Sequence, residues 1–202
     1  MKIYFVRHGQ LQWQVERDDT NWNSPLTSLG QQQAHRLAAW LADSPLVDKD
    51  TYLKVNTIAA SPLLRAQQTA APICEALHLL LTTDDYLSEA DFLVSAHLAA
   101  VESPAQYPPV YTPSEIYAAF KDRALHALSN LVEIADNNSD GSVLAIGHGG
   151  LISTVLRLAV GSDTVSFWLY NASLNLIEWK RGRWHLVHLN LWDHLPPRFR
   201  TF

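Results

Sequence analysis

Short apolar runs alternate with amphipathic stretches along the 202-residue chain. The runs 3–6, 56–60 and 141–146 are rich in β-branched and small apolar residues, which indicates buried strands. After each run, apolar residues recur at intervals of three and four, which predicts amphipathic helices. The helices are expected over residues 27–43, 61–78, 112–138 and 151–160.

The last part of the chain shows a different pattern. Residues 172–179 and 184–191 alternate moderately around a turn near Arg181 and Gly182, which predicts an antiparallel hairpin at the margin of a sheet. A further short strand is predicted at 79–81. Strands that alternate with amphipathic helices are typical of a mostly parallel sheet. We therefore predict an α/β three-layer sandwich, with a mostly parallel central sheet, an antiparallel margin and helices on both faces.

Several segments between these elements carry local signals. Residues 84–112 lack periodicity and gather prolines and tyrosines, so we expect a small cap or lid inserted into a single domain that spans 1–202. Thr112 opens a Thr-Pro-Ser-Glu sequence that fits a capping box, in which the glutamate would return a hydrogen bond to the Thr112 amide. Ser61 precedes a proline, which fits an N-cap followed by the first helical position. Residues 11–23 are polar and aperiodic, which predicts a loop.

Charge and composition exclude several classes of partner. The chain carries 15 Lys and Arg against 20 Asp and Glu, a formal net charge of −5 at pH 7. Nucleic acids and anionic membranes favour basic surfaces, so we expect neither as a partner. No apolar stretch is long enough to span a bilayer, and no signal peptide is recognisable. Together with a single cysteine, these features predict a cytoplasmic protein.

Polar side chains with catalytic potential follow three of the predicted strands. Arg7 and His8 follow the first strand, and His148 follows the strand at 141–146. Arg65 lies in the first turn of the helix after the second strand. If these strands are parallel neighbours, the four side chains meet at one edge of the sheet, beside two helix amino ends with free N–H groups. Two guanidinium groups, two imidazoles and helix amino ends suit a dianionic phosphoryl group.

Two other uses of these residues fit less well. A divalent cation held by the paired histidines would lie against Arg7, and no third ligand has a usual spacing, so we expect neither a metal nor another cofactor. Acyl hydrolysis by a serine would need a Gly-x-Ser-x-Gly sequence, which the chain lacks. Phosphoryl transfer also needs a proton donor for the leaving oxygen. Glu89 and Asp91, at the start of the cap, are both candidates.

Five stretches in chain order resemble the signatures of the histidine phosphatase superfamily, the phosphoglycerate-mutase-like enzymes. They are residues 7–9, 26–34, 61–70, 87–89 and 147–150. The resemblance covers the chain from end to end and implies a metal-independent phosphomonoester hydrolase of the phosphatase branch. It implies that His8 accepts the phosphoryl group as a phosphohistidine and that Glu89 protonates the leaving alcohol. Arg7, Arg65 and His148 would hold the phosphoryl oxygens.

The resemblance also implies contacts with the substrate and exposes departures from the family pattern. Gln14 stands where many members have an asparagine that touches the phosphate, and Gly149 lies in the last signature, so both are predicted to bind substrate. Leu11 replaces a serine or threonine that is common after the first signature. The glycine- and tryptophan-rich continuation seen in many relatives is missing after Glu89.

Alternatives to hydrolysis of a small phosphorylated metabolite stay open. A phosphoglycerate mutase would share the nucleophile, but the short stretch between Glu89 and Thr112 has no Lys or Arg, which favours hydrolysis. A phosphoprotein phosphatase or a catalytically silent phospholigand-binding module are further alternatives. Edge strands and surface tryptophans permit a homodimer without requiring one. Four aromatic residues are candidates for lining a site that takes a ring-bearing leaving group: Trp13, Trp22, Tyr107 and Tyr111. Packing in the fold is the commoner role of such residues.

Overall fold

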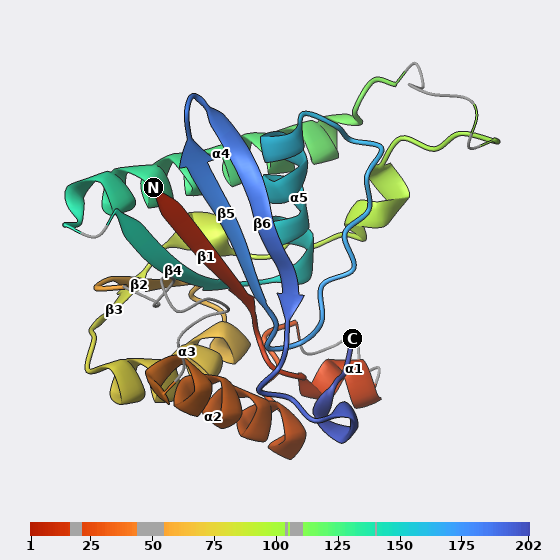
Figure 1. The fold of residues 1–202 in the computed structure, drawn as a ribbon. Helices are drawn as coiled ribbons and strands as arrows, with labels where there is room; N and C mark the ends of the chain where they lie inside the picture. The colour runs from red at the N-terminus through yellow and green to blue at the C-terminus, as the bar shows by residue number, and fades with distance from the viewer. Residues whose placement is uncertain (17–21, 44–54, 104, 106–110, 140) are drawn as a thin grey trace.

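A six-stranded sheet of order β3-β2-β4-β1-β5-β6 forms the centre of the computed structural model (Figure 1), which describes residues 1–16, 22–43, 55–103, 105, 111–139 and 141–202. The strands are β1 (Lys2–Arg7), β2 (Ile58–Ala60), β3 (Leu81–Thr83), β4 (Ser142–Gly147), β5 (Leu174–Lys180) and β6 (Arg183–Leu191). Strands β1 to β4 pair in parallel, whereas β5 is antiparallel to both β1 and β6. The predicted mostly parallel sheet with an antiparallel margin is therefore confirmed.

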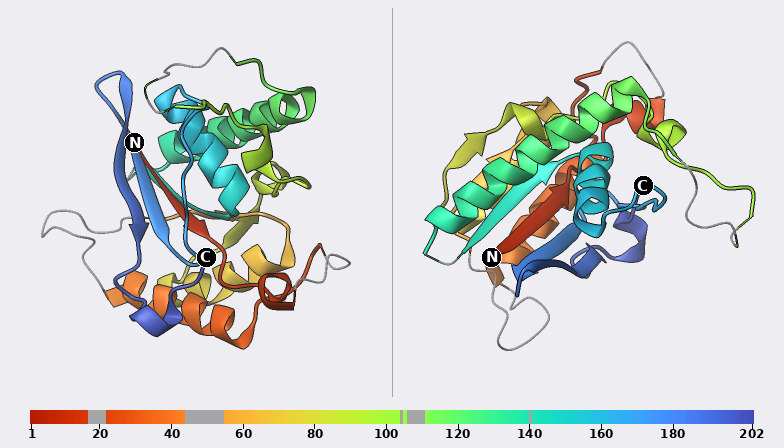
Figure 2. Two further views of the ribbon diagram at one scale, coloured as in Figure 1. Left: turned by 90° about the vertical axis from the view of Figure 1, so that its right-hand side faces the viewer. Right: turned by 90° about the horizontal axis from the view of Figure 1, so that it is seen from above.

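Helices cover both faces of the sheet, as Figure 2 shows. The α-helices are α1 (Gln12–Glu16), α2 (Ser28–Asp43), α3 (Leu64–Leu77), α4 (Glu115–Asn137) and α5 (Gly149–Val160). The described residues also form three short 3-10 helices, η1 (Asp85–Leu87), η2 (Val94–His97) and η3 (Pro197–Phe199). Among the described residues, no helix is both long and apolar enough to cross a membrane.

Two separate cores hold the layers together, and β1 contributes to both. Ile3 and Phe5 join the core beneath α4 and α5, whereas Tyr4 and Val6 join the core beneath α2 and α3. This division follows from the strand geometry, because successive side chains of a strand point to opposite faces of the sheet. A run of four apolar residues therefore marks a strand that is buried on both sides.

The predicted N-cap of α3, Ser61, is wrong by two residues. The N-cap is Leu63, and the helix begins at Leu64. The Ser61 hydroxyl is used elsewhere, because its Oγ lies 2.8 Å from Nε2 of His148. The Ser-Pro pair thus lies in the turn that precedes the helix, where a side chain can reach a neighbouring strand end.

The predicted capping box before α4 is also wrong. The N-cap is Ser114 rather than Thr112, and no side-chain hydrogen bond caps the helix. Ser114 Oγ instead lies 2.7 Å from Nδ1 of His97, so a contact outside the helix has taken the place of the cap. Glu115 is consequently the first residue of α4 and has no place in a box that starts at Thr112.

Two other local predictions need correction. The predicted loop at 11–23 contains the short helix α1, which buries no side chain and so leaves no apolar period in the sequence. The third strand is Leu81–Thr83 instead of 79–81, because His78 adopts a left-handed conformation and the Leu79 N–H still bonds Cys74 O at the end of α3. Residues 104 and 106–110 of the predicted cap lie outside the described residues, and the cap at 84–112 stays a prediction.

Candidate active site

The carboxyl ends of β1, β2 and β4 lie side by side, which brings the predicted site residues together. Arg7 pairs with Gly147 in the parallel register of β1 and β4, and β2 pairs in parallel with the other side of β4. Just beyond the strand ends, the His8 N–H donates to Gly147 O over 3.0 Å. The ring centroids of His8 and His148 are 5.1 Å apart. Both imidazoles are buried at this edge.

His8 is held as a neutral imidazole with a free ring nitrogen. Its Nδ1 lies 2.7 Å from the carbonyl oxygen of Gly9. Because a carbonyl oxygen only accepts hydrogen bonds, Nδ1 carries the proton and Nε2 keeps a lone pair. Burial, together with the positive charges of Arg7 and Arg65, holds the pKa of His8 well below its usual range. The arrangement suits a nucleophile at Nε2.

In both Arg7 and Arg65, one guanidinium nitrogen donates a hydrogen bond to a protein carbonyl, and another has no hydrogen-bond partner among the described residues. Nη1 of Arg7 donates to Leu169 O, and Nη1 of Arg65 donates to Trp22 O over 2.9 Å. The Nε atoms of both arginines are buried and have no hydrogen-bond partner among the described residues. Burial lowers the pKa of Arg7 to about 10, so this guanidinium stays charged at neutral pH. Charged donors in such surroundings suit an anionic ligand.

His148 is held by Ser61 and presents its other ring nitrogen unpaired. Nε2 of His148 lies 2.8 Å from Ser61 Oγ, which also accepts the Leu63 N–H over 3.3 Å. Nδ1 is buried and without a partner among the described residues. If the Ser61 hydroxyl donates its proton to Nε2, Nδ1 carries the ring proton and is a donor for an anion. Burial, followed by the positive charges of Arg65 and Arg7, lowers the pKa of His148 well below its usual range.

The carboxylate of Glu89 occupies the amino end of α5. Its Oε2 accepts the Gly150 N–H over 2.9 Å, and its Oε1 accepts the Leu151 N–H over 3.0 Å. A Cβ at Gly150 would lie 2.5 Å from Oε1, so a side chain there would displace the Glu89 carboxylate. At α3, the Leu64 N–H donates to Asn23 Oδ1 over 2.7 Å. Protein oxygens therefore already accept three of the N–H groups that were expected to be free for a ligand at these helix ends.

Of the two candidate acids, Glu89 is the one that lies near the site arginines. Burial lowers the pKa of Arg65, and the Glu89 carboxylate opposes that shift, as it does for Arg7. Arg123 Nη2 donates to the backbone oxygen of Glu89 over 2.9 Å, which fixes this segment. Asp91 is exposed, and the cation on which its charge acts is Arg123.

The two residues predicted to bind substrate differ in their surroundings. The Gln14 side-chain amide donates to Phe202 O over 2.9 Å and to Asn171 Oδ1 over 3.3 Å. Contact between Gln14 and a phosphate stays a prediction, and it would require these bonds to be exchanged. Gly149 is the first residue of α5, and a Cβ there would lie 3.4 Å from Arg7 Nε. Its lack of a side chain leaves room beside the guanidinium.

Sequence reasoning did not identify three residues that support the site. They are Ser61 as the partner of His148, Arg123 as the donor to the Glu89 backbone, and the fully buried Asn171, whose Nδ2 donates to His8 O over 3.1 Å. Ser61 lies in a recognisable motif, but that motif suggested a helix cap. Arg123 and Asn171 lie far along the chain in segments without a signature, so no local signal was present.

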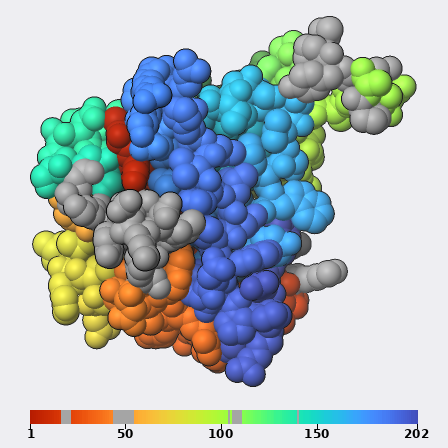
Figure 3. Space-filling model, viewed as in Figure 1, coloured from red at the N-terminus to blue at the C-terminus, as the bar shows by residue number. Residues whose placement is uncertain are grey.

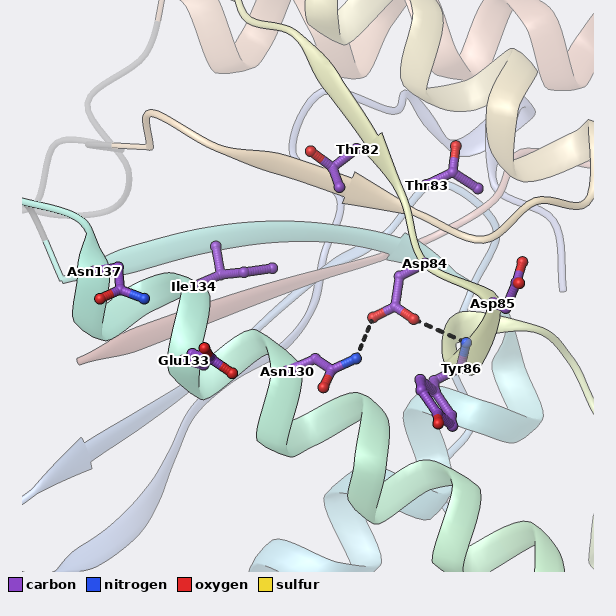
Figure 4. Close-up of a pocket in the computed structure, with 9 residues that line it drawn as sticks. All are labelled: Thr82, Thr83, Asp84, Asp85, Tyr86, Asn130, Glu133, Ile134 and Asn137. Atoms are coloured by element: carbon purple, nitrogen blue, oxygen red, sulfur yellow. Dashed lines mark hydrogen bonds between the residues drawn. The ribbon is translucent and has the colours of Figure 1, made fainter.

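A separate cavity of about 450 Å³ lies at the edge of the sheet formed by β3, between β3, η1 and α4 (Figure 4). Its wall includes Asp84, whose carboxylate accepts hydrogen bonds from the Tyr86 N–H and from Asn130 Nδ2. None of its lining residues is a predicted site residue. Within the described part of the chain, no three His, Cys, Asp or Glu side chains are grouped so that they could hold a metal ion.

The mostly parallel sheet with two histidines and two arginines at its carboxyl edge defines an α/β protein with a basic, buried site. The chain belongs to the histidine phosphatase superfamily (branch 1), whose family model matches residues 3–191. The predicted family is therefore confirmed.

Proteins similar to this chain include two that are named phosphatases and one that is named a phosphoglycerate mutase. The uncharacterized phosphatase PhoE of Bacillus subtilis is 28% identical over 197 residues, which are 96% of each chain. A phosphoserine phosphatase mutant of Entamoeba histolytica in complex with phosphoserine superposes with a TM-score of 0.71 at 19% identity, covering 96% of this chain and 99% of the other. A phosphoglycerate mutase of Bacillus anthracis has a TM-score of 0.72 at 21% identity, covering 96% of this chain and 94% of the other. The predicted fold is confirmed, and the predicted enzyme class, a phosphatase, agrees with the names of the first two proteins.

Proposed function

We propose that this chain hydrolyses phosphomonoesters of small metabolites, without a metal ion, through a phosphohistidine intermediate on His8. The observation that carries the proposal is the set of buried, unpaired donors beside a neutral imidazole. Nε of Arg7, Nε of Arg65 and Nδ1 of His148 lack partners among the described residues, and the Gly9 carbonyl leaves Nε2 of His8 with its lone pair. A phosphoryl group supplies acceptors for these donors and an electrophile for the nitrogen.

The reaction follows in two balanced steps. Nε2 of His8 attacks phosphorus, the N–P bond forms, and the P–O bond to the leaving alcohol breaks as Glu89 donates a proton to that oxygen. In the second step Glu89 takes a proton from water, the oxygen of water bonds to phosphorus, and the N–P bond breaks to release inorganic phosphate. Arg7, Arg65 and His148 stabilise the charge on the phosphoryl oxygens in both steps.

Hydrolysis is favoured over the mutase alternative by the residues of the cap. A mutase holds the phosphoenzyme for a second anionic acceptor, and the stretch between Glu89 and Thr112 supplies no Lys or Arg to bind one. Incubation with 3-phosphoglycerate, followed by 31P NMR, distinguishes the two activities, because hydrolysis yields inorganic phosphate and a mutase yields 2-phosphoglycerate.

The first test is hydrolysis of p-nitrophenyl phosphate with and without EDTA, for wild type and His8→Ala. We expect turnover that EDTA does not reduce and that falls at least about 10³-fold in the variant, because the nucleophile is lost. A base-stable, acid-labile phosphoenzyme should be trapped in wild type alone. Turnover that EDTA abolishes would overturn the metal-independent mechanism. Equal, negligible turnover in both proteins would instead favour a phospholigand-binding module.

Glu89→Gln and Asp91→Asn form a matched pair that tests the acid. An alkyl alcohol is a poor leaving group and needs a proton, whereas p-nitrophenolate needs much less help. We expect Glu89→Gln to lower kcat for an alkyl phosphate about 10²-fold, and to lower kcat for p-nitrophenyl phosphate by a much smaller factor. Asp91→Asn should leave both rates unchanged. The opposite pattern would assign the proton transfer to Asp91.

A further inference from the structure

Exposed aromatic side chains lie against both of the site arginines. The ring centroid of Phe202 is 5.2 Å from Cζ of Arg7, and the ring centroid of Trp22 is 5.5 Å from Cζ of Arg65. These are the guanidinium groups whose Nε atoms have no partner among the described residues. The aromatic surface is therefore continuous with the candidate phosphate site.

Phe202 belongs to a group of rings that we call the aromatic cluster, formed by Trp168, Tyr170 and Phe202. The Phe202 ring lies 5.3 Å from that of Trp168 and 5.7 Å from that of Tyr170, centroid to centroid. Trp168 is 68% exposed, Phe202 56% and Trp22 49%. Figure 3 shows that the segment after α5 and the C-terminal segment meet on the protein surface. Clustered exposed rings of this kind typically mark a binding surface.

Hydrogen bonds hold the aromatic cluster in place relative to the nucleophile. The Asn171 N–H donates to Thr201 O over 3.0 Å, and Thr201 Oγ1 donates to Asn171 Oδ1 over 2.9 Å. Gln14 Nε2 donates to Phe202 O over 2.9 Å. The same Asn171 side chain donates to His8 O over 3.1 Å. One buried asparagine therefore connects the backbone of the attacking histidine with the segment that carries the Phe202 ring.

The structure sorts the aromatic residues named from the sequence as candidates for a ring-binding site. Trp22 lies against Arg65, as that expectation requires. Tyr111 instead donates a hydrogen bond to His97 O and packs against the core beneath α4 and α5. Tyr107 lies outside the described residues. Trp168 and Phe202 had no signature in the sequence.

We propose that Phe202 and Trp168, with Trp22 on the side of Arg65, form the subsite for the leaving group and that it takes an aromatic, uncharged ring. The inference rests on the proposed function, because it places the phosphate on Arg7 and Arg65. In an in-line displacement the leaving oxygen points away from His8 Nε2, so the alcohol extends toward the exposed side of the site. A ring there buries apolar area and makes edge-to-face or offset contacts with the aromatic cluster.

The test compares two substrates that differ in the presence of an aromatic ring but have leaving groups of similar reactivity. 2-Phenylethyl phosphate and ethyl phosphate both release primary alcohols, so their leaving groups have similar acidity. We expect wild type to show at least about tenfold higher kcat/KM for 2-phenylethyl phosphate, a factor that an aromatic contact with its buried area can supply. Phe202→Ala should reduce this ratio about tenfold, and Trp168→Ala should reduce it in the same direction.

Trp179→Ala is the matched control. Trp179 is 40% exposed and lies toward the end of β5 that pairs with the start of β1, at the sheet edge opposite His8. Loss of the Trp179 side chain should leave kcat/KM for both substrates, and the ratio of the two values, unchanged. The subsite is overturned if wild type hydrolyses both esters without preferring 2-phenylethyl phosphate, or if Phe202→Ala lowers both kcat/KM values by the same factor. Equal losses would show that Phe202 only orients Arg7.

A binding measurement separates this inference from the proposed function. Benzylphosphonate and methylphosphonate cannot be hydrolysed at the P–C bond by the proposed reaction, and calorimetric titration gives their affinities directly. If wild type hydrolyses neither ester, the proposed hydrolysis fails. The subsite is then supported by tighter binding of benzylphosphonate that Phe202→Ala reduces, and it is overturned by equal binding of the two phosphonates.

Discussion

Two clusters of charged side chains around buried arginines differ in how many of their hydrogen-bond donors have a protein acceptor. In the first, beneath α4, Arg157 Nε donates to the Tyr117 hydroxyl over 2.9 Å, and its Nη2 donates to Thr154 Oγ1 over 2.8 Å. The Tyr117 hydroxyl in turn donates to Asp163 Oδ1 over 3.0 Å. Lys121 forms an ion pair with the other oxygen of Asp163. The hydrogen bonds of Arg157 thus have protein acceptors, and the Asp163 carboxylate has a protein cation.

The second cluster, at the carboxyl ends of β1 and β4, is left incomplete. Arg7 and Arg65 keep unpaired Nε atoms, and His148 keeps an unpaired Nδ1, as judged over the described residues. The nearby carboxylate of Glu89 is occupied by the N–H groups of α5. A buried donor without an acceptor costs about 1–3 kcal/mol, so this cluster does not serve stability, in agreement with the proposed phosphate site. The comparison distinguishes a structural network from a binding site.

The largest contrast should appear in catalysis. Arg65→Ala removes an Nε–H donor that has no acceptor among the described residues, and we expect kcat/KM for p-nitrophenyl phosphate to fall about 10³-fold. The free energy of unfolding should stay unchanged or rise, because a buried, partly unsatisfied charge is removed. Steady-state kinetics and urea unfolding of the same preparation check both statements. A stability loss as large as the catalytic loss would contradict the contrast.

Arg157→Ala should behave in the opposite way. The substitution removes the donor to the Tyr117 hydroxyl and to Thr154 Oγ1 and leaves these buried groups without it, so we expect the free energy of unfolding to fall by about 2 kcal/mol. At a temperature where the variant is folded, kcat/KM should stay within about twofold of wild type. Urea unfolding measures the first effect. A stable variant with poor turnover would place Arg157 in the catalytic machinery and break the comparison.

The histidines of the incomplete cluster should make stability depend on pH. Burial lowers the pKa of His8 and of His148 in the folded state, so below about pH 6.5 the unfolded chain binds more protons than the folded one. Stability is therefore complete above that pH and is lost as the pH falls. Each histidine contributes a slope of at most about 1.4 kcal/mol per pH unit. Urea unfolding at several pH values should show a smaller slope for His8→Asn and an unchanged slope for Arg157→Ala.

The smallest effect concerns the proton on His148. Ser61→Ala removes the group bonded to Nε2, so the ring can carry its proton on Nε2 and lose the Nδ1 donor. We expect kcat to fall about tenfold, the value of one hydrogen bond. Two-dimensional 15N NMR of the imidazoles reports the tautomer directly and without turnover. An unchanged tautomer in the variant would show that Ser61 does not direct the proton.

The amino-acid sequence by itself determined the layers of the fold and the main members of the site. Apolar periods located β1, β4 and the four longer helices α2 to α5, because burial of one helix face or of both strand faces leaves a regular pattern. Arg7, His8, Arg65 and His148 were found from their positions after strands or in a first helical turn. The positions are informative because the carboxyl ends of neighbouring parallel strands lie at the same edge of the sheet.

Only the tertiary structure decided which polar atoms are satisfied and which are left for a ligand. The helix end that was expected to bind an anion is occupied by Glu89, and the serine that was expected to cap α3 bonds His148, 87 residues further along the chain. Phe202 reaches Arg7 from the other end of the sequence. Contacts of this kind join residues that are far apart in the chain, so they leave no local period or motif. They arise only when the packed layers bring separate strand ends and loops together.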